Sequence, residues 1–213
     1  GSGADAGPNY TIEYQQGTLT VMDKERVTIT GVVISDKIYD AKKVTCNTEN
    51  LKAVDADNVS VTGLTYSYSI VGEEDDGTKI EYKSAENLTI GKEISDGMPQ
   101  NAGQYKLKIK VSSEVAGYKG IQQYNFDITK RHVTVKADDV SIKNGSKLPA
   151  FSYTVKGFLK DDGSALDGTS EDQEILEKFV TRPVLSCNVK DTGTPGEYTI
   201  RPSGAYAGPN YLM

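Results

Sequence analysis

Apolar and polar residues alternate along several stretches of the chain. In residues 105–111 the odd positions are tyrosine, leucine, isoleucine and valine, and the even positions are three lysines. Successive side chains of a strand point to opposite faces, so this pattern predicts a strand with one buried face and one basic, solvated face. Residues 66–70 and 124–128 repeat the period of two, and Val27-Thr28-Ile29 adds another run.

Turn residues separate these stretches. They fall at Asp75-Asp76-Gly77, Ser95-Asp96-Gly97 and Asn101-Ala102-Gly103. Asp, Asn and Ser bond to nearby backbone in turns, and glycine supplies the positive φ that many turns require. Short strands at close spacing, without a helical period, predict an antiparallel β-sandwich of immunoglobulin-like architecture over residues 25–130.

The last part of the chain adds a helical period to its strands. Strands are predicted at residues 132–136, 151–155, 184–189 and 198–200. Ser170 is placed to cap a helix, with Gln173 at capping-box spacing and Pro183 as the stop. The apolar face of this helix would consist of Ile175, Leu176, Phe179 and Val180. Residues 131–213 are therefore predicted to form a β-rich module with one short helix, which makes the whole chain mostly β.

One five-residue sequence occurs near both ends of the chain. Ala-Gly-Pro-Asn-Tyr stands at residues 6–10 and again at residues 207–211. A weaker copy of this ending lies in the middle of the chain. A Gly-x-Tyr sequence occurs at residues 103–105 and again at residues 196–198. In both places another tyrosine follows 13 residues later: Tyr118 follows Tyr105, and Tyr211 follows Tyr198. Internal repeats of this kind predict tandem modules that end in the same way.

If each module ends in the same way, the chain divides into three parts. Residues 1–24 would be an expression scar, Gly1-Ser2-Gly3, followed by the closing strand of an upstream module. Residues 25–130 would be a complete module, and residues 131–213 a module without its last strand. The open edge would then accept residues 9–21 of another copy, bulged near Gly17, in a head-to-tail strand exchange.

Short motifs in both modules resemble known bacterial repeats. Residues 128–139 and 153–159, with the ending at residues 196–200 and 208–211, resemble an MBG domain, and residues 9–21 are similar to its closing strand. Asp36-Lys37-Ile38-Tyr39-Asp40 resembles the opening of YDG-type and related bacterial Ig-like repeats, although Ala41 stands where such repeats have glycine. The resemblance implies repeats of bacterial cell-surface, adhesin-like proteins, located outside the cell or in its wall, with no catalytic residues.

Composition excludes several classes of partner. The net charge is −6 and the isoelectric point about 4.9, whereas nucleic-acid binding requires clustered Lys and Arg. No apolar run approaches the roughly 20 residues that a membrane helix needs, so membrane insertion is not expected. Cys46 and Cys187 fall in different modules and are expected to be unpaired thiols.

The residues that could carry catalysis or bind a metal or sugar have simpler structural explanations. His132 is the single histidine and opens a strand, so neither a catalytic triad nor a metal site is predicted around it. The acidic segments 55–58, 73–76 and 161–167 fail the calcium-loop pattern and are interpreted as solvated turns. With 30 acidic residues, a glycosidase pair is neither supported nor excluded. The absence of Trp weakens sugar binding, while Tyr82, Tyr118 and Tyr206 remain open candidates.

The sequence therefore favours a non-catalytic structural or adhesion segment of a surface protein, without cofactors, whose partners are neighbouring repeats. A stalk spacer is the first hypothesis. The second is a module that binds a host glycan or protein through exposed loops such as 72–79 or 160–170. The third is an accessory domain of a larger secreted enzyme.

Overall fold

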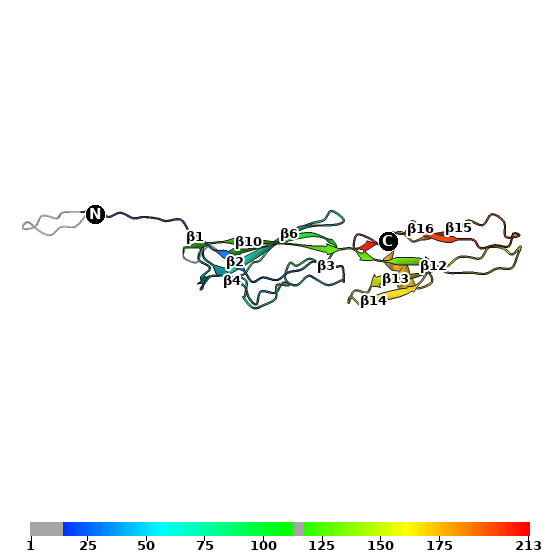
Figure 1. Cartoon of the computed structure of the whole chain (residues 1–213), viewed down its shortest axis with the longest axis horizontal. Coiled ribbons are helices and arrows are strands. Elements are labelled where there is room, and N and C mark those ends of the chain that lie inside the picture. Colours follow the sequence, from blue (N-terminus) through cyan, green and yellow to red (C-terminus); the bar gives the residue numbers. More distant parts are fainter. Residues whose placement is uncertain (1–14, 113–116) are drawn as a thin grey trace, which may run out of the picture.

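The computed structural model describes residues 15–112 and 117–213. The chain forms two consecutive β-rich modules that follow one another along the long axis of the molecule (Figure 1). Each has its own cluster of buried apolar side chains, one drawn from residues 27–128 and the other from residues 133–207. The predicted mostly-β fold with one short helix is confirmed. The division of the chain into residues 1–24, 25–130 and 131–213 stays a prediction.

The first module contains β1 (Glu25–Arg26), β2 (Thr28–Thr30), β3 (Lys37–Ile38), β4 (Lys52–Val54), β5 (Ser60–Val61), β6 (Tyr66–Glu74), β7 (Lys79–Lys83), β8 (Gly103–Val111), β9 (Tyr118–Lys119) and β10 (Ile121–Thr129). Its main sheet has the order β3-β10-β8-β6-β7, and β2-β4-β5 form a smaller sheet. The β1–β9 and β10–β3 pairs are parallel, which a purely antiparallel sandwich would not contain.

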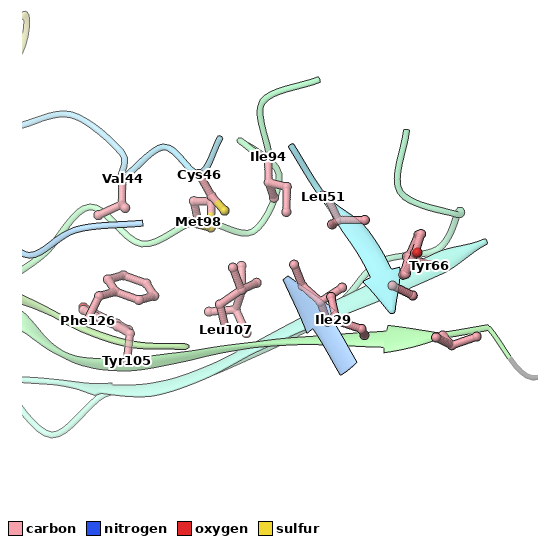
Figure 2. Close-up of a cluster of buried hydrophobic side chains, with 14 of the residues drawn as sticks. Ile29, Val44, Cys46, Leu51, Tyr66, Ile94, Met98, Tyr105, Leu107 and Phe126 are labelled. Carbon is pink, nitrogen blue, oxygen red and sulfur yellow. The ribbon is translucent and has the colours of Figure 1, made fainter. Parts of the chain in front are cut away.

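The alternation predicted for residues 105–111 is confirmed on β8. All four of its apolar odd-numbered residues are buried, while Lys106 and Lys110 are exposed. The core lies between the main sheet and a second layer that is largely irregular chain (Figure 2). That layer contributes Val44, Cys46, Ile94 and Met98, opposite side chains of the sheet such as Leu107 and Phe126.

The second module contains β11 (Arg131–His132), β12 (Thr134–Ala137), β13 (Tyr153–Leu159), β14 (Ala165–Thr169), α1 (Gln173–Lys178), β15 (Val184–Cys187), β16 (Ile200–Ser203) and β17 (Tyr211–Leu212). Its sheets are β12-β13-β14, β15-β16 and the parallel pair β11-β17. Strand β14 occupies residues that the sequence had assigned to a loop, and β16 begins two residues later than its predicted strand.

The helix exists, but its predicted ends were wrong. Asp172, not Ser170, is the N-cap residue, and the Ser170 hydroxyl instead accepts a hydrogen bond from the Tyr153 amide at the start of β13. The helix ends at Lys178, well before Pro183, because the amides of Val180 and Thr181 donate to the Tyr206 carbonyl.

The buried face of the helix is also narrower than predicted. Ile175 and Phe179 are buried as expected, and Leu176 is half-buried. The side chain of Val180, the fourth predicted member, is 70% exposed because the helix has already ended there.

The chain before β1 makes no strand in this structure. Residues 15–24 have no regular secondary structure, and Leu19, Val21 and Met22 are more than four-fifths exposed. The first part of the closing strand predicted at residues 9–21 lies outside the described residues. Figure 1 shows the N-terminal segment leaving the first module at the end opposite to the second module.

Candidate functional site

His132 lies at the joint between the modules, in β11. It is exposed and pairs through its backbone with Leu212 of β17. Both cysteines are free thiols, as expected: Cys46 is buried in the first core and Cys187 lies half-buried on β15. Burial raises the pKa of the Cys46 thiol to about 11, which keeps it protonated and unreactive at neutral pH.

The acidic segments form turns in part, at residues 56–57, 75–76 and 161–162, whereas Glu73 and Glu74 belong to β6 and Asp167 to β14. The Asp55 carboxylate accepts the amides of Asp57 and Val59, and the Asp162 carboxylate accepts the amide and hydroxyl of Ser164. The hydrogen bonds from Ser164 hold the pKa of Asp162 below its usual value. These oxygens are therefore occupied by local backbone bonding.

Across residues 15–112 and 117–213, no group of three or more His, Cys, Asp or Glu side chains is arranged to hold a metal ion. In the same part of the chain, no helix has the length and apolar character to cross a membrane.

The three open tyrosines are not gathered at one site. The Tyr82 ring lies 5.7 Å from the Tyr68 ring and covers Gly97, where a Cβ atom would come within 2.1 Å of Tyr82 Cγ. Tyr118 is half-buried in β9 of the first module, and Tyr206 is exposed in the second module, where it bridges to Thr181. They do not form a shared aromatic platform for a sugar.

A cleft of about 870 Å³ lies in the second module. It lies between the segment that links β12 to β13 and the segment that links β15 to β16. Its lining includes the apolar residues Val140, Ile142, Leu148, Phe151, Val189 and Ile200. Three of these, Val140, Ile142 and Leu148, are between 42% and 48% exposed, so the cleft has an apolar and uncovered wall.

Polar contacts join the two modules at their junction. Only Lys130 separates β10 from β11, so the chain passes directly from one module to the next. From the second module, Asn210 Oδ1 accepts the Ala102 amide at 2.7 Å, and Asn210 Nδ2 donates to Asn101 Oδ1 at 3.0 Å. The turn at residues 101–103 of the first module is thereby held by one side chain of the second.

Tyr211 joins the two cores at the same place. Its ring meets the Tyr39 ring of the first module edge-on, with 5.4 Å between centroids, and the Phe158 ring of the second module at 5.1 Å. The Tyr211 hydroxyl also accepts the Leu159 amide at 3.4 Å. Edge-on aromatic contacts stabilise by about 0.5–1.5 kcal/mol beyond their buried area. A single residue therefore packs against both modules.

Both loops named as candidates for an adhesive patch lie near this junction. Residues 72–79 reduce to a short turn between β6 and β7, where Asp75 forms an ion pair with Lys130 at 3.4 Å. Within 160–170, Gly163 packs so closely on the first module that a Cβ atom there would come within 2.7 Å of the Asp40 carbonyl. Residues 75–79 and 160–162 are exposed, and binding of a partner through these loops stays a prediction.

The sequence had singled out Asn210 and Tyr211 as the end of a repeat, but not as contacts across a junction. Nothing in the sequence pairs Asn210 with Asn101, which lies 109 residues earlier, or Tyr211 with Tyr39, which lies still further away. The available signal was the identity of residues 6–10 and 207–211, since side chains that face a neighbouring module would recur wherever modules follow one another.

Comparison with known proteins addresses the second module. A search of curated proteins finds no match to the chain. The resemblance of residues 25–130 to YDG-type repeats stays a prediction. For the second module, the family predicted from its short motifs is confirmed, because residues 133–213 match the family model of the MBG domain (YGX type).

Proposed function

We propose that this chain is a non-catalytic spacer segment of a bacterial cell-surface protein, in which consecutive β-modules are stacked into a stalk. The MBG domain at residues 133–213 supports a surface repeat protein. The observation that carries the spacer role is the junction, where Asn210 and Tyr211 contact both modules and only one residue separates β10 from β11.

A stalk must keep its two ends at a fixed separation, so its modules must not rotate freely relative to one another. Interfaces between domains in one chain commonly allow relative motion unless they are well packed. Here the direct strand-to-strand connection combines with an aromatic contact and two hydrogen bonds of the Asn210 side chain. Together these favour one fixed orientation of the modules.

Small-angle X-ray scattering on the whole chain tests this proposal. We expect the scattering curve to match one elongated particle with the module arrangement of Figure 1. Substituting Asn210→Ala should increase the spread of module orientations, while Asn144→Ala, at an exposed position between β12 and β13, should not. A native curve that requires many bent arrangements would exclude a stiff spacer.

A further inference from the structure

The outer face of the main sheet in the first module carries a row of lysines. β8 is the central strand of the order β3-β10-β8-β6-β7, and Lys106, Lys108 and Lys110 alternate along it with residues that are buried in the core. The three lysines therefore share the face that points away from the core. Positions two residues apart on a strand are separated by about 6.8 Å, so the three lysine Cα atoms span roughly 14 Å.

The strands on either side of β8 continue this face. Of the six positions directly opposite the three lysines, two carry Val71 and Ile121, and four carry a hydroxyl or an amide: Ser67 and Ser69 on β6, and Gln123 and Asn125 on β10. Lys83 of β7 lies opposite Ser69 and adds a fourth lysine to the same side of the sheet. These four lysines and the four hydroxyl and amide residues are called the lysine face below.

The three lysines of β8 have no negative partner in the part of the chain that the structure describes. No carboxylate there forms an ion pair with any of them. The acidic side chains on this side of the sheet lie beside or beyond Lys106: Glu73, Glu81 and Asp127. Two of these are already paired, Glu73 with Lys79 and Glu81 with Lys83. The charge of the β8 lysines is therefore not neutralised within the described chain.

Two general roles of surface lysines do not account for this row. Lysines on edge strands prevent sheets from pairing edge to edge, but β8 is the central strand. Solubility requires charge of either sign, and the chain already has a net charge of −6. That overall charge does not cancel the local field, because exposed charges more than about 8 Å away are largely screened at physiological ionic strength. The lysine face therefore attracts an anion at short range.

The absence of aromatic rings narrows the kind of anion. None of the described aromatic residues of β6, β7, β8 and β10 lies on the lysine face, because all of them pack on the core side: Tyr66, Tyr68, Tyr82, Tyr105, Tyr124 and Phe126. Proteins bind single-stranded nucleic acids by stacking bases on aromatic rings, so this face is unsuited to them. A polysaccharide with carboxylate or sulfate groups needs cations for its charges and short polar side chains for its hydroxyls.

We propose that the lysine face binds an acidic polysaccharide in an extended form. The lysines donate charge-assisted hydrogen bonds to its carboxylate or sulfate groups, and the serine, glutamine and asparagine side chains bond to its sugar hydroxyls. A spacer with this face would hold a charged glycan along the side of the first module. The proposal concerns one sheet of that module and does not depend on a stiff junction.

Isothermal titration calorimetry of the whole chain with a heparin hexasaccharide tests the binding. The affinity should fall as salt rises, because each lysine that neutralises an anionic group releases counterions. Substituting Lys106, Lys108 and Lys110 together by Gln should weaken binding by at least about tenfold and reduce the salt dependence. The matched control replaces Lys43, Lys52 and Lys92 by Gln, which removes three exposed lysines that lie outside the main sheet.

The control variant should keep the native affinity. An equal loss in both variants would show that binding follows net charge alone, and would overturn the proposal. A native chain that binds neither the heparin hexasaccharide nor a hyaluronan hexasaccharide at low salt would also overturn it. Circular dichroism of both variants checks that their folds are unchanged.

NMR titration with the same hexasaccharide locates the site. The backbone signals of residues 67–69, 106–110 and 123–125 should shift, while a neutral dextran hexasaccharide should leave them in place. Shifts confined to the second module would contradict the proposal. Tighter binding of a single-stranded oligothymidylate or of phosphatidylserine vesicles, lost in the β8 variant, would assign the lysine face to another anion and contradict a polysaccharide ligand.

Discussion

The side chains of Asn210 and Asn101 lie in different modules and are joined by a hydrogen bond of 3.0 Å from Nδ2 of Asn210 to Oδ1 of Asn101. The same Asn210 side chain accepts the amide of Ala102, which is fully buried. A polar side chain that satisfies a buried amide of the neighbouring module fixes both distance and rotation, since hydrogen bonds weaken steeply when misaligned.

Asn210→Ala should uncouple the unfolding of the two modules. The substitution removes two hydrogen bonds and leaves the Ala102 amide without its acceptor, at a cost of about 1–3 kcal/mol. Differential scanning calorimetry should show one transition for the native chain and two resolved or broadened transitions for the variant. Asn144→Ala serves as the control and should retain the native profile.

Ala41→Gly should stabilise the first module modestly. Ala41 has φ of 59°, a left-handed conformation that costs a residue with a Cβ roughly 1–2 kcal/mol and costs glycine little. The greater freedom of glycine in the unfolded chain offsets part of this gain. We expect the free energy of unfolding to rise by up to about 1 kcal/mol in urea titrations.

Gly31→Ala should destabilise the first module. Gly31 has φ of 78°, and a Cβ atom there would lie 1.7 Å from the Asn50 carbonyl oxygen. The same titration should show a loss of roughly 2–4 kcal/mol because the backbone at Asn50 must shift. Equal stability of Gly31→Ala and the native chain would contradict the local backbone described here.

The two thiols should differ in reactivity. Iodoacetamide at pH 8 should label Cys187, which is half-buried beside the cleft, and should spare Cys46 until the protein unfolds. The pKa of Cys46 is raised from 9.0 to about 11 by burial, so the unfolded chain loses this proton at lower pH than the folded one. Its contribution to stability is complete below pH 9 and is lost between about pH 9 and 11, and labelling should accelerate over that range.

Chelation should leave stability unchanged. The carboxylates of Asp55 and Asp162 are engaged by nearby backbone amides. We therefore expect the same melting temperature with and without EDTA, whereas bound calcium would stabilise the native state by mass action. A clear drop in melting temperature would restore the acidic turns as candidate calcium sites.

Local patterns predicted the strands better than the layers they form. The alternation at residues 105–111 identified β8 because one face of that strand is fully covered. The second layer of the first module could not be predicted, since Val44, Cys46, Ile94 and Met98 reach the core from irregular segments without periodicity. Their burial depends on contacts with strands distant in the sequence.

The ends of the helix also could not be predicted from local sequence patterns. Ser170 has the chemistry of an N-cap, but its hydroxyl is taken by the Tyr153 amide, a tertiary contact that local spacing does not reveal. The candidate site follows this pattern too. The repeat identified Asn210 and Tyr211 as a module ending, and only the fold brings them to Asn101 and Tyr39.

The most direct test of a fixed junction is the measurement of amide residual dipolar couplings for the whole chain in solution. If Asn210 and Tyr211 hold the modules in one orientation, the couplings of residues 25–112 and 117–129 and those of residues 131–213 fit a single alignment tensor with the arrangement in Figure 1. Two tensors of clearly different magnitude would show that the modules move independently, and would contradict the proposal that this chain is a stiff spacer.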